Sequence, residues 1–110
     1  MEYLIIVILG IISALLLSNI INSKRKTIGY VYVLHSEHGY KIGKTKNVNQ
    51  RMSYFGLKLP FKTTLVLLIQ SDRYSELEKI LHRKFESKRI NGEWFTLNNK
   101  DLNYIKNLEY

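Results

Sequence analysis

The chain has 110 residues, no cysteine and a formal net charge of +8, with 17 Lys and Arg residues against nine Asp and Glu residues. This length allows one small domain, and the lack of cysteine excludes a disulfide framework. The excess of positive charge favours a polyanionic partner, either nucleic acid or an anionic membrane surface.

The first segment of the chain is almost wholly apolar. Residues 3–21 read YLIIVILGIISALLLSNII, interrupted only by Gly10, two serines and Asn19. This is about the length that a helix needs to cross the hydrocarbon core of a bilayer, so we expect a transmembrane anchor within residues 1–23. The alternatives are a signal peptide or a buried core helix, but the basic start and small-residue cleavage site of a signal peptide are not evident.

The charges beside this run predict its orientation. The sequence NSKRK follows the run directly, whereas its N-terminal flank holds only Met1 and Glu2. Because positive residues favour the cytoplasmic side, we expect a single-pass membrane protein with its N-terminus outside and residues 24–110 in the cytoplasm. Glu2 is the only charged residue among residues 1–23, so residues 24–110 carry one positive charge more than the whole chain, +9.

The next residues predict a β-hairpin followed by a helix. YVYVL (30–34) is rich in aromatic and β-branched residues, and YKIGKT (40–45) is the expected returning strand after the polar turn HSEHG. Asn47 is a good helix N-cap and Gly56 a helix stop, which together predict a short helix over Val48–Phe55.

The remaining residues complete a predicted α+β domain with a small antiparallel sheet and helices packed on it. TTLVLLIQ (63–70) is a continuous apolar run, so we expect the central strand, covered on both faces. A helix capped by Ser71 or Asp72 is expected to run to about residue 87, followed by a short strand over 94–97 and a last helix over about 100–108.

Three motifs occur in a fixed order in this domain: YVYVL with YKIGKTKNVNQRM, then LEKILH (77–82), then GEWF (92–95). Together they resemble the GIY-YIG nuclease superfamily, and within it the phage and viral branch often described as a DNA-binding domain. The resemblance covers residues 29–97 and depends on several motifs agreeing in order, since each motif alone is weak. It implies a GIY-YIG-like fold and a metal-dependent endonuclease that cuts DNA.

The resemblance also implies roles for individual residues. Glu78 matches the helix glutamate that holds one divalent metal, Mg²⁺ or Mn²⁺, and a carboxylate is a suitable ligand for such an ion. Arg51 matches the helix arginine, whose planar guanidinium suits a phosphate. Tyr32 matches the tyrosine of the first motif. His82, one helical turn after Glu78, is a further candidate ligand or acid, although a histidine beside an apolar stripe is usually structural.

The chain departs from the family pattern at the second tyrosine of the motif. Counting back from Gly43, that position falls on Lys41, with Tyr40 one residue earlier. Neighbouring strand residues point to opposite faces, so only one of them can join Tyr32, and the hairpin register decides which. A lysine there could bind phosphate or lower the pKa of a neighbouring tyrosine, making it a better base.

Two further departures concern later positions. Phe55 stands one turn after Arg51, where many relatives carry histidine or tyrosine, and Asn91 and Glu93 are only loose candidates for a late asparagine. These departures bear more on turnover than on nucleic-acid binding. Trp94 and Phe95 are expected to be core residues rather than base-stacking groups.

Basic residues outside the catalytic set would extend a positive surface for a DNA or RNA backbone. These are Lys44, Lys46, Lys58, Lys62, Arg83, Lys84, Lys88 and Arg89. Two other functions compete with the nuclease hypothesis. One is a nucleic-acid-binding module of the same fold with weak or absent catalysis, and the other is a domain whose basic surface holds anionic lipid.

Overall fold

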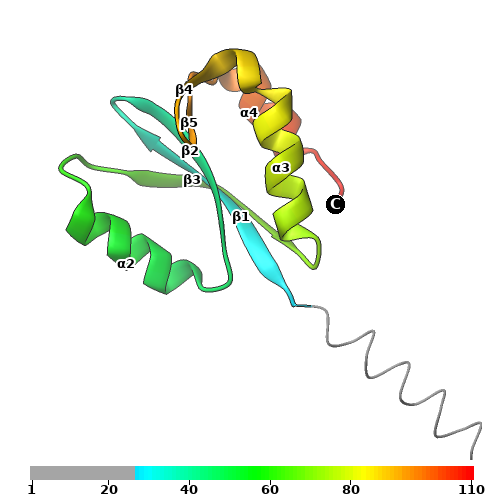
Figure 1. The fold of residues 1–110 in the computed structure, drawn as a ribbon, viewed down its shortest axis with the longest axis horizontal. Coiled ribbons are helices and arrows are strands. Elements are labelled where there is room, and N and C mark those ends of the chain that lie inside the picture. The colour runs from blue at the N-terminus through cyan, green and yellow to red at the C-terminus, as the bar shows by residue number, and fades with distance from the viewer. Residues whose placement is uncertain (1–26) are drawn as a thin grey trace, which may run out of the picture.

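The computed structural model describes residues 27–110, and the transmembrane anchor predicted within residues 1–23 lies outside them. None of the helices in the described range is long and apolar enough to cross a bilayer. The described part is an α+β domain with a five-stranded antiparallel sheet and three α-helices (Figure 1). Its elements are β1 (Gly29–Ser36), β2 (Gly39–Thr45), α2 (Val48–Lys58), β3 (Thr64–Ser71), α3 (Tyr74–Lys84), the 3-10 turn η1 (Glu86–Lys88), β4 (Arg89–Asn91), β5 (Trp94–Phe95) and α4 (Asn99–Lys106).

The strand order is β3-β1-β2-β5-β4, which places β3 at an edge of the sheet. The expectation of a central strand at residues 63–70 is therefore wrong. On one side of β3, Leu67 and Ile69 pack against the main core, but Leu68 on the other side is 44% exposed. A register shift opposite Val33 and Leu34 interrupts the pairing with β1. A continuous apolar run indicates a strand, but it does not fix the position of that strand within the sheet.

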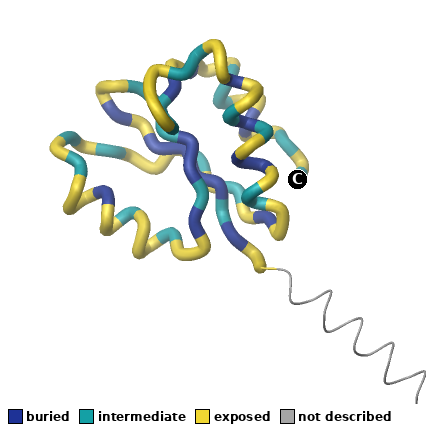
Figure 2. The backbone as a smooth tube through the Cα atoms, viewed as in Figure 1, coloured by how far each residue is buried: buried dark blue, intermediate teal, exposed yellow. Residues whose placement is uncertain are grey.

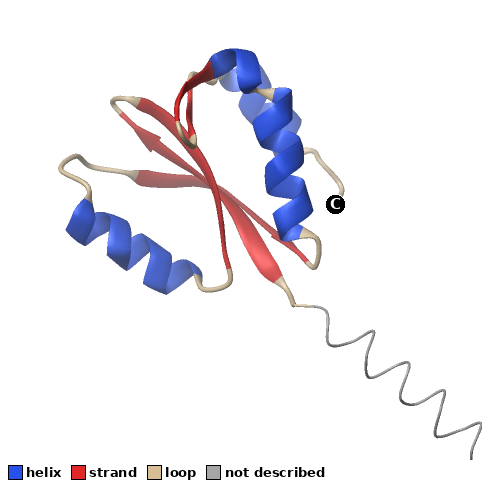
Figure 3. Cartoon of the chain, viewed as in Figure 1, coloured by secondary structure: helices blue, strands red, loops and turns tan. Residues whose placement is uncertain are grey.

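Two unequal layers cover the sheet (Figures 1 and 3). Helices α3 and α4 lie on one face, where Leu77, Leu81 and Ile105 join the main core with no exposed surface. Helix α2 lies on the other face, where the buried residues of a much smaller cluster are Tyr32, Leu34 and Phe55. The buried residues follow β1 and β2 through the middle of the domain, whereas α2 and β3 are mostly exposed (Figure 2).

Helix α2 begins where the sequence predicts and ends later. The Asn47 side chain accepts a hydrogen bond from the Gln50 amide at 3.0 Å, which confirms the N-cap. Gly56 does not stop the helix, which continues to Lys58 and ends at Leu59, immediately before Pro60. The residue before a proline is driven out of the helical conformation, so the proline and not the glycine ends α2.

The later helices differ from expectation mainly at their ends. Ser71 accepts a hydrogen bond from the Arg73 amide at 2.9 Å, but the N-cap of α3 is Arg73, without a side-chain cap. Helix α3 ends at Lys84, and the residues beyond it tighten into η1. Helix α4 begins after Asn98, whose side chain forms a reciprocal capping box with Asp101, a start signal missing from the sequence prediction.

Candidate nucleic-acid interface and catalytic site

The register of the β1–β2 hairpin decides which side chains share a face. The two-residue loop Glu37–His38 pairs Ser36 with Gly39, and consequently Tyr32 with Gly43 and Leu34 with Lys41. Lys41 therefore lies on the same face as Tyr32, which is the face covered by α2. Tyr40 pairs with His35 on the opposite face and packs against the main core there. Of the two alternatives that the sequence left open, the structure brings Lys41, and not Tyr40, to Tyr32.

The Tyr32 ring lies across Gly43. A Cβ at position 43 would be 2.3 Å from the Tyr32 hydroxyl oxygen, which is too close for any side chain. Glycine is needed at this point because the aromatic ring passes directly over the backbone. The hydroxyl of the buried Tyr32 therefore lies over Gly43 of β2. The pairing of β2 with β5 involves Tyr40 and Lys41 and does not extend to Gly43.

Charged groups from α2, from α3 and from the segment before β5 act on the Tyr32 hydroxyl. Burial raises its pKa most strongly, the carboxylates of Glu93 and Glu78 raise it further, and the Arg51 guanidinium partly offsets them. The pKa of Tyr32 is thus raised and not lowered, although Lys41 lies on the same face of the sheet. At neutral pH the phenol keeps its proton, so it can donate a hydrogen bond to an anion but is a poor base.

Glu78 projects from α3 and is only 8% exposed. Its Oε2 is fully buried and has no hydrogen-bond partner within the described part of the chain. Burial and the neighbouring Glu93 raise its pKa, against smaller opposing effects of His82, Lys44 and Lys41. A buried carboxylate oxygen without a partner is unfavourable, so this position suits a group that gains a partner when ligand binds.

This unpartnered oxygen fits a divalent cation. No group of three or more His, Cys, Asp or Glu side chains among the described residues could enclose a metal. Mg²⁺, however, usually binds through one or two carboxylates and keeps several of its waters. Glu78 meets that minimal requirement.

Lys41 and Glu93 form an ion pair at the same place, with 2.8 Å between Nζ and Oε2. The Lys41 side chain is only 14% exposed. Its ammonium lies 5.5 Å from the centre of the Phe55 ring and 5.7 Å from that of Trp94. The pairing of β2 with β5, which sets Lys41 opposite Trp94, brings Glu93 to this position. The sequence offered only a loose reason to single out Glu93, because a short distant strand creates the contact.

His82 has a structural partner in this arrangement. Its Nε2–H donates a hydrogen bond of 2.8 Å to the backbone carbonyl of Ile42, and its ring lies 5.1 Å from that of Phe95. The histidine thus ties α3 to β2 and holds the segment of α3 that carries Glu78. Its proton is engaged with a carbonyl, which favours a positioning role over that of an acid.

Arg51 lies at the mouth of the site and is exposed. With Thr45, Gln50 and Tyr54 it lines a pocket of about 240 Å³. A neighbouring pocket of about 340 Å³ adds Lys44 and Lys46 to Arg51. Lys46 and Arg51 therefore lie together at the junction of β2 and α2, where they could contact a phosphate backbone. The Lys44 ammonium instead lies toward α3 and donates a hydrogen bond of 3.1 Å to the Ser75 hydroxyl.

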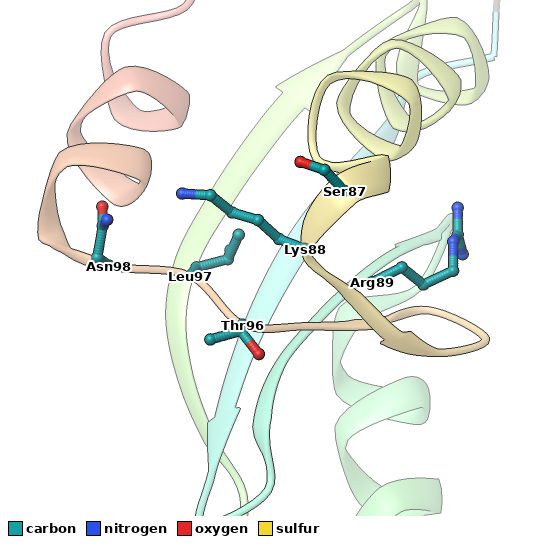
Figure 4. Close-up of a pocket in the computed structure, with 6 residues that line it drawn as sticks. All are labelled: Ser87, Lys88, Arg89, Thr96, Leu97 and Asn98. Carbon is teal, nitrogen blue, oxygen red and sulfur yellow. The ribbon is translucent and has the colours of Figure 1, made fainter.

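The other predicted basic residues are placed differently. Lys88 pairs with Asp101, and Arg89 pairs with Glu86. Both line a pocket of about 480 Å³ between η1 and α4, in which Lys88 extends toward Asn98 while Arg89 points away (Figure 4). Because internal carboxylates already neutralise these two cations, they offer less to a phosphate than the cations beside α2. Lys84 lies over the Tyr104 ring at 4.7 Å, and Arg83 is exposed on α3.

The comparisons with known proteins identify a domain family. The family model of the T5orf172 domain matches residues 29–108, a range that includes every strand and helix described above. No curated protein matches the chain, and no solved structure does.

Proposed function

Because that match covers most of its length, the chain belongs to the T5orf172 domain family, and we propose that it is a GIY-YIG-like endonuclease hydrolysing DNA phosphodiester bonds with one divalent metal. The T5orf172 domain is phage-associated and related to GIY-YIG and HNH-like nuclease folds. The family therefore indicates a nucleic-acid-binding or nuclease module. Cleavage, the metal and the membrane anchor are the parts that we add to this.

One observation carries the proposal. Three charged residues from different segments act on the buried Tyr32 hydroxyl. They are Arg51 from α2, Glu78 from α3 and Glu93 from the segment before β5. A phosphodiester that enters here meets a guanidinium, a phenolic donor and an unpartnered carboxylate together. Hydrolysis needs groups of these kinds to bind the phosphate, stabilise developing charge and exchange protons.

In this proposal each residue of the site has a separate role. Arg51 binds the non-bridging phosphate oxygens through its planar guanidinium. Tyr32 keeps its proton and donates a hydrogen bond, while Gly43 allows its ring to reach the site. Glu78 would hold Mg²⁺ or Mn²⁺, and such an ion supplies a Lewis acid and makes water a stronger nucleophile. Lys41 keeps Glu93 fixed by their ion pair.

A second function is favoured by a specific observation. Lys41 occupies the position of the family's second tyrosine, and its ammonium is bound to Glu93 rather than free for a phosphate. The alternative is therefore a nucleic-acid-binding module of the same fold with little or no turnover. In that case the cations beside α2 retain binding, because neutralising phosphate does not require the metal ligand.

The proposed location of the domain follows from the apolar run of residues 3–21. We propose that this run anchors the chain in a membrane with residues 24–110 in the cytoplasm, where DNA would be accessible. Alkaline carbonate extraction of membranes from expressing cells tests the anchor, since an integral protein stays in the pellet. Release of the chain into the supernatant would contradict it.

The test of the nuclease function compares three variants of the full chain with the wild type on supercoiled plasmid, with Mg²⁺ or Mn²⁺. Glu78→Gln and Arg51→Ala should lose nicking. Glu76→Gln is the matched control, since Glu76 lies on the same helix but is exposed and paired with Arg73. Equal nicking by all four proteins would contradict the proposal. Salt-dependent DNA binding without nicking by the wild type would establish the alternative.

A further inference from the structure

Aromatic rings form a row across the face of the sheet that carries α2. The His38 and Phe61 ring centres are 4.7 Å apart, and those of Phe61 and Trp94 are 5.6 Å apart. The Lys41 ammonium bridges Trp94 to Phe55, and Tyr54 follows at 5.8 Å from Phe55. We call these five rings the aromatic row: His38, Phe61, Trp94, Phe55 and Tyr54.

The aromatic row is a surface feature for most of its length. Tyr54 is 51% exposed, His38 is exposed, and Phe61 and Trp94 are partly exposed, while Phe55 is the buried spacer between them. Trp94 was expected in the core, but it is its neighbour Phe95 that is fully buried there. Four separate segments contribute rings to this side, although the main core lies on the opposite face of the sheet.

Two pockets flank Phe61. One, of about 470 Å³, has walls that include the apolar side chains of Leu34, Met52 and Leu65. The other, of about 370 Å³, lies toward His35 and Glu37. Both are also lined by Lys62. Pockets of this size accept a small planar ligand, and each one places a ring beside a cation.

Cations lie near both ends of the aromatic row. Lys62 stands next to Phe61, and Arg51 lines a pocket together with Tyr54. Single-stranded nucleic acid is bound by this combination, in which successive bases stack on aromatic rings while cations follow the backbone. A duplex keeps the faces of its bases stacked inside, so it could use the cations but not the rings.

We propose that the aromatic row binds unpaired bases of single-stranded DNA, with flanking phosphates at Lys62 and Arg51. This rests on the proposed function, because it names the form of DNA that the same face accepts. The row passes Lys41 and ends beside Arg51, so a strand lying along it enters the catalytic site directly. The preferred substrate is then DNA with an unpaired segment rather than a continuous duplex.

Trp94 provides a direct probe, because it is the only tryptophan in the chain. The full chain in non-ionic detergent would be titrated with oligo(dT) and with a duplex of equal length at matched salt, following tryptophan fluorescence. Oligo(dT) should quench Trp94 and bind about 10-fold more tightly than the duplex. Phe61→Ala should weaken oligo(dT) binding about 10-fold and leave duplex binding within twofold. Phe61→Tyr keeps a ring at this position and should bind oligo(dT) as tightly as the wild type.

Two further variants guard against loss of folding. Tyr54→Ala changes an exposed ring of the row and should weaken oligo(dT) binding in the same direction. Tyr104→Ala is the matched control: Tyr104 is 41% exposed and contacts Phe85 on the opposite side of the sheet, so both affinities should stay unchanged.

The outcomes separate this inference from the proposed function. Equal binding of both forms without quenching, unaffected by Phe61→Ala, would overturn the aromatic row while leaving a DNA-binding domain. Preference for oligo(dT) without cleavage of either plasmid or single-stranded DNA would uphold the row and remove the nuclease. Failure to bind either form would overturn both.

Discussion

The two faces of the sheet differ in how much apolar surface they bury. On the face of α3 and α4, nine buried apolar residues form a continuous core with partly buried neighbours around it. On the face of α2, three buried residues suffice, and the remaining area is occupied by ionised groups, exposed rings and pockets. The difference indicates that one face supplies most of the stability and leaves the other free to contact a ligand.

Substitutions in the main core should therefore have the largest effect on folding. Leu81 has no exposed surface, and replacing it with alanine removes buried contacts and leaves a cavity. We expect Leu81→Ala to lower the free energy of unfolding by about 2–5 kcal/mol, a large part of the stability of a small domain. Urea denaturation of the full chain measures this. Leu68→Ala on the exposed edge strand is the control, and a loss as large as that of Leu81→Ala would contradict the contrast between the faces.

Substitutions on the face of α2 should instead lower the rate of plasmid nicking. A methyl group at Gly43 would lie 2.3 Å from the Tyr32 hydroxyl oxygen, so Gly43→Ala must displace that ring. A misplacement of about 1 Å in a catalytic group can cost about 100-fold in rate, and we expect a loss of that order in plasmid nicking. DNA affinity should change little, since the exposed cations are untouched. Nicking at the wild-type rate would show that Tyr32 takes no part in the reaction.

The hairpin and α2 also show how far the sequence can predict this site. Asn47 and the alternating aromatic residues of β1 are local signals, and both elements form, although α2 ends later than predicted. The side on which Lys41 lies depends on a two-residue loop that the sequence allowed but did not require. The contact of Lys41 with Glu93 depends on the pairing of β2 with β5, and the edge position of β3 depends on strand order. Such long-range pairings leave no local pattern to read.

The pH dependence of stability should separate functional from structural groups. Burial and Glu93 raise the pKa of Glu78, so the native state disfavours its ionised form. Ionised Glu78 then destabilises the fold at neutral pH, and the stability is regained as the pH falls through the raised native pKa. We expect Glu78→Gln to be more stable than the wild type at pH 7. The difference should shrink on acidification and level off below the unfolded-state pKa of about 4.3.

Urea midpoints of the two proteins between pH 3 and 7 provide this measurement. Carboxylates that do not interact with Glu78, such as Asp101 with its lowered pKa, titrate equally in both proteins, so their contributions cancel in the difference. A Glu78→Gln variant less stable than the wild type at pH 7 would mean that the carboxylate supports the fold and is not held ready for a ligand.

The smallest effect is expected where α2 has room to spare. Gly56 lies inside the helix in an exposed position, and a Cβ built there meets no atom within 4 Å. Alanine restricts the unfolded chain and favours the helix, so Gly56→Ala should raise the free energy of unfolding by about 0.5–1 kcal/mol. Plasmid nicking should stay at the wild-type level. This variant is therefore the counterpart of Gly43→Ala, because a neighbouring aromatic ring requires glycine at position 43 but not at position 56. A loss of stability would mean that α2 packs more tightly against the sheet than its exposed surface indicates, and the contrast between the two faces would then be weaker than proposed.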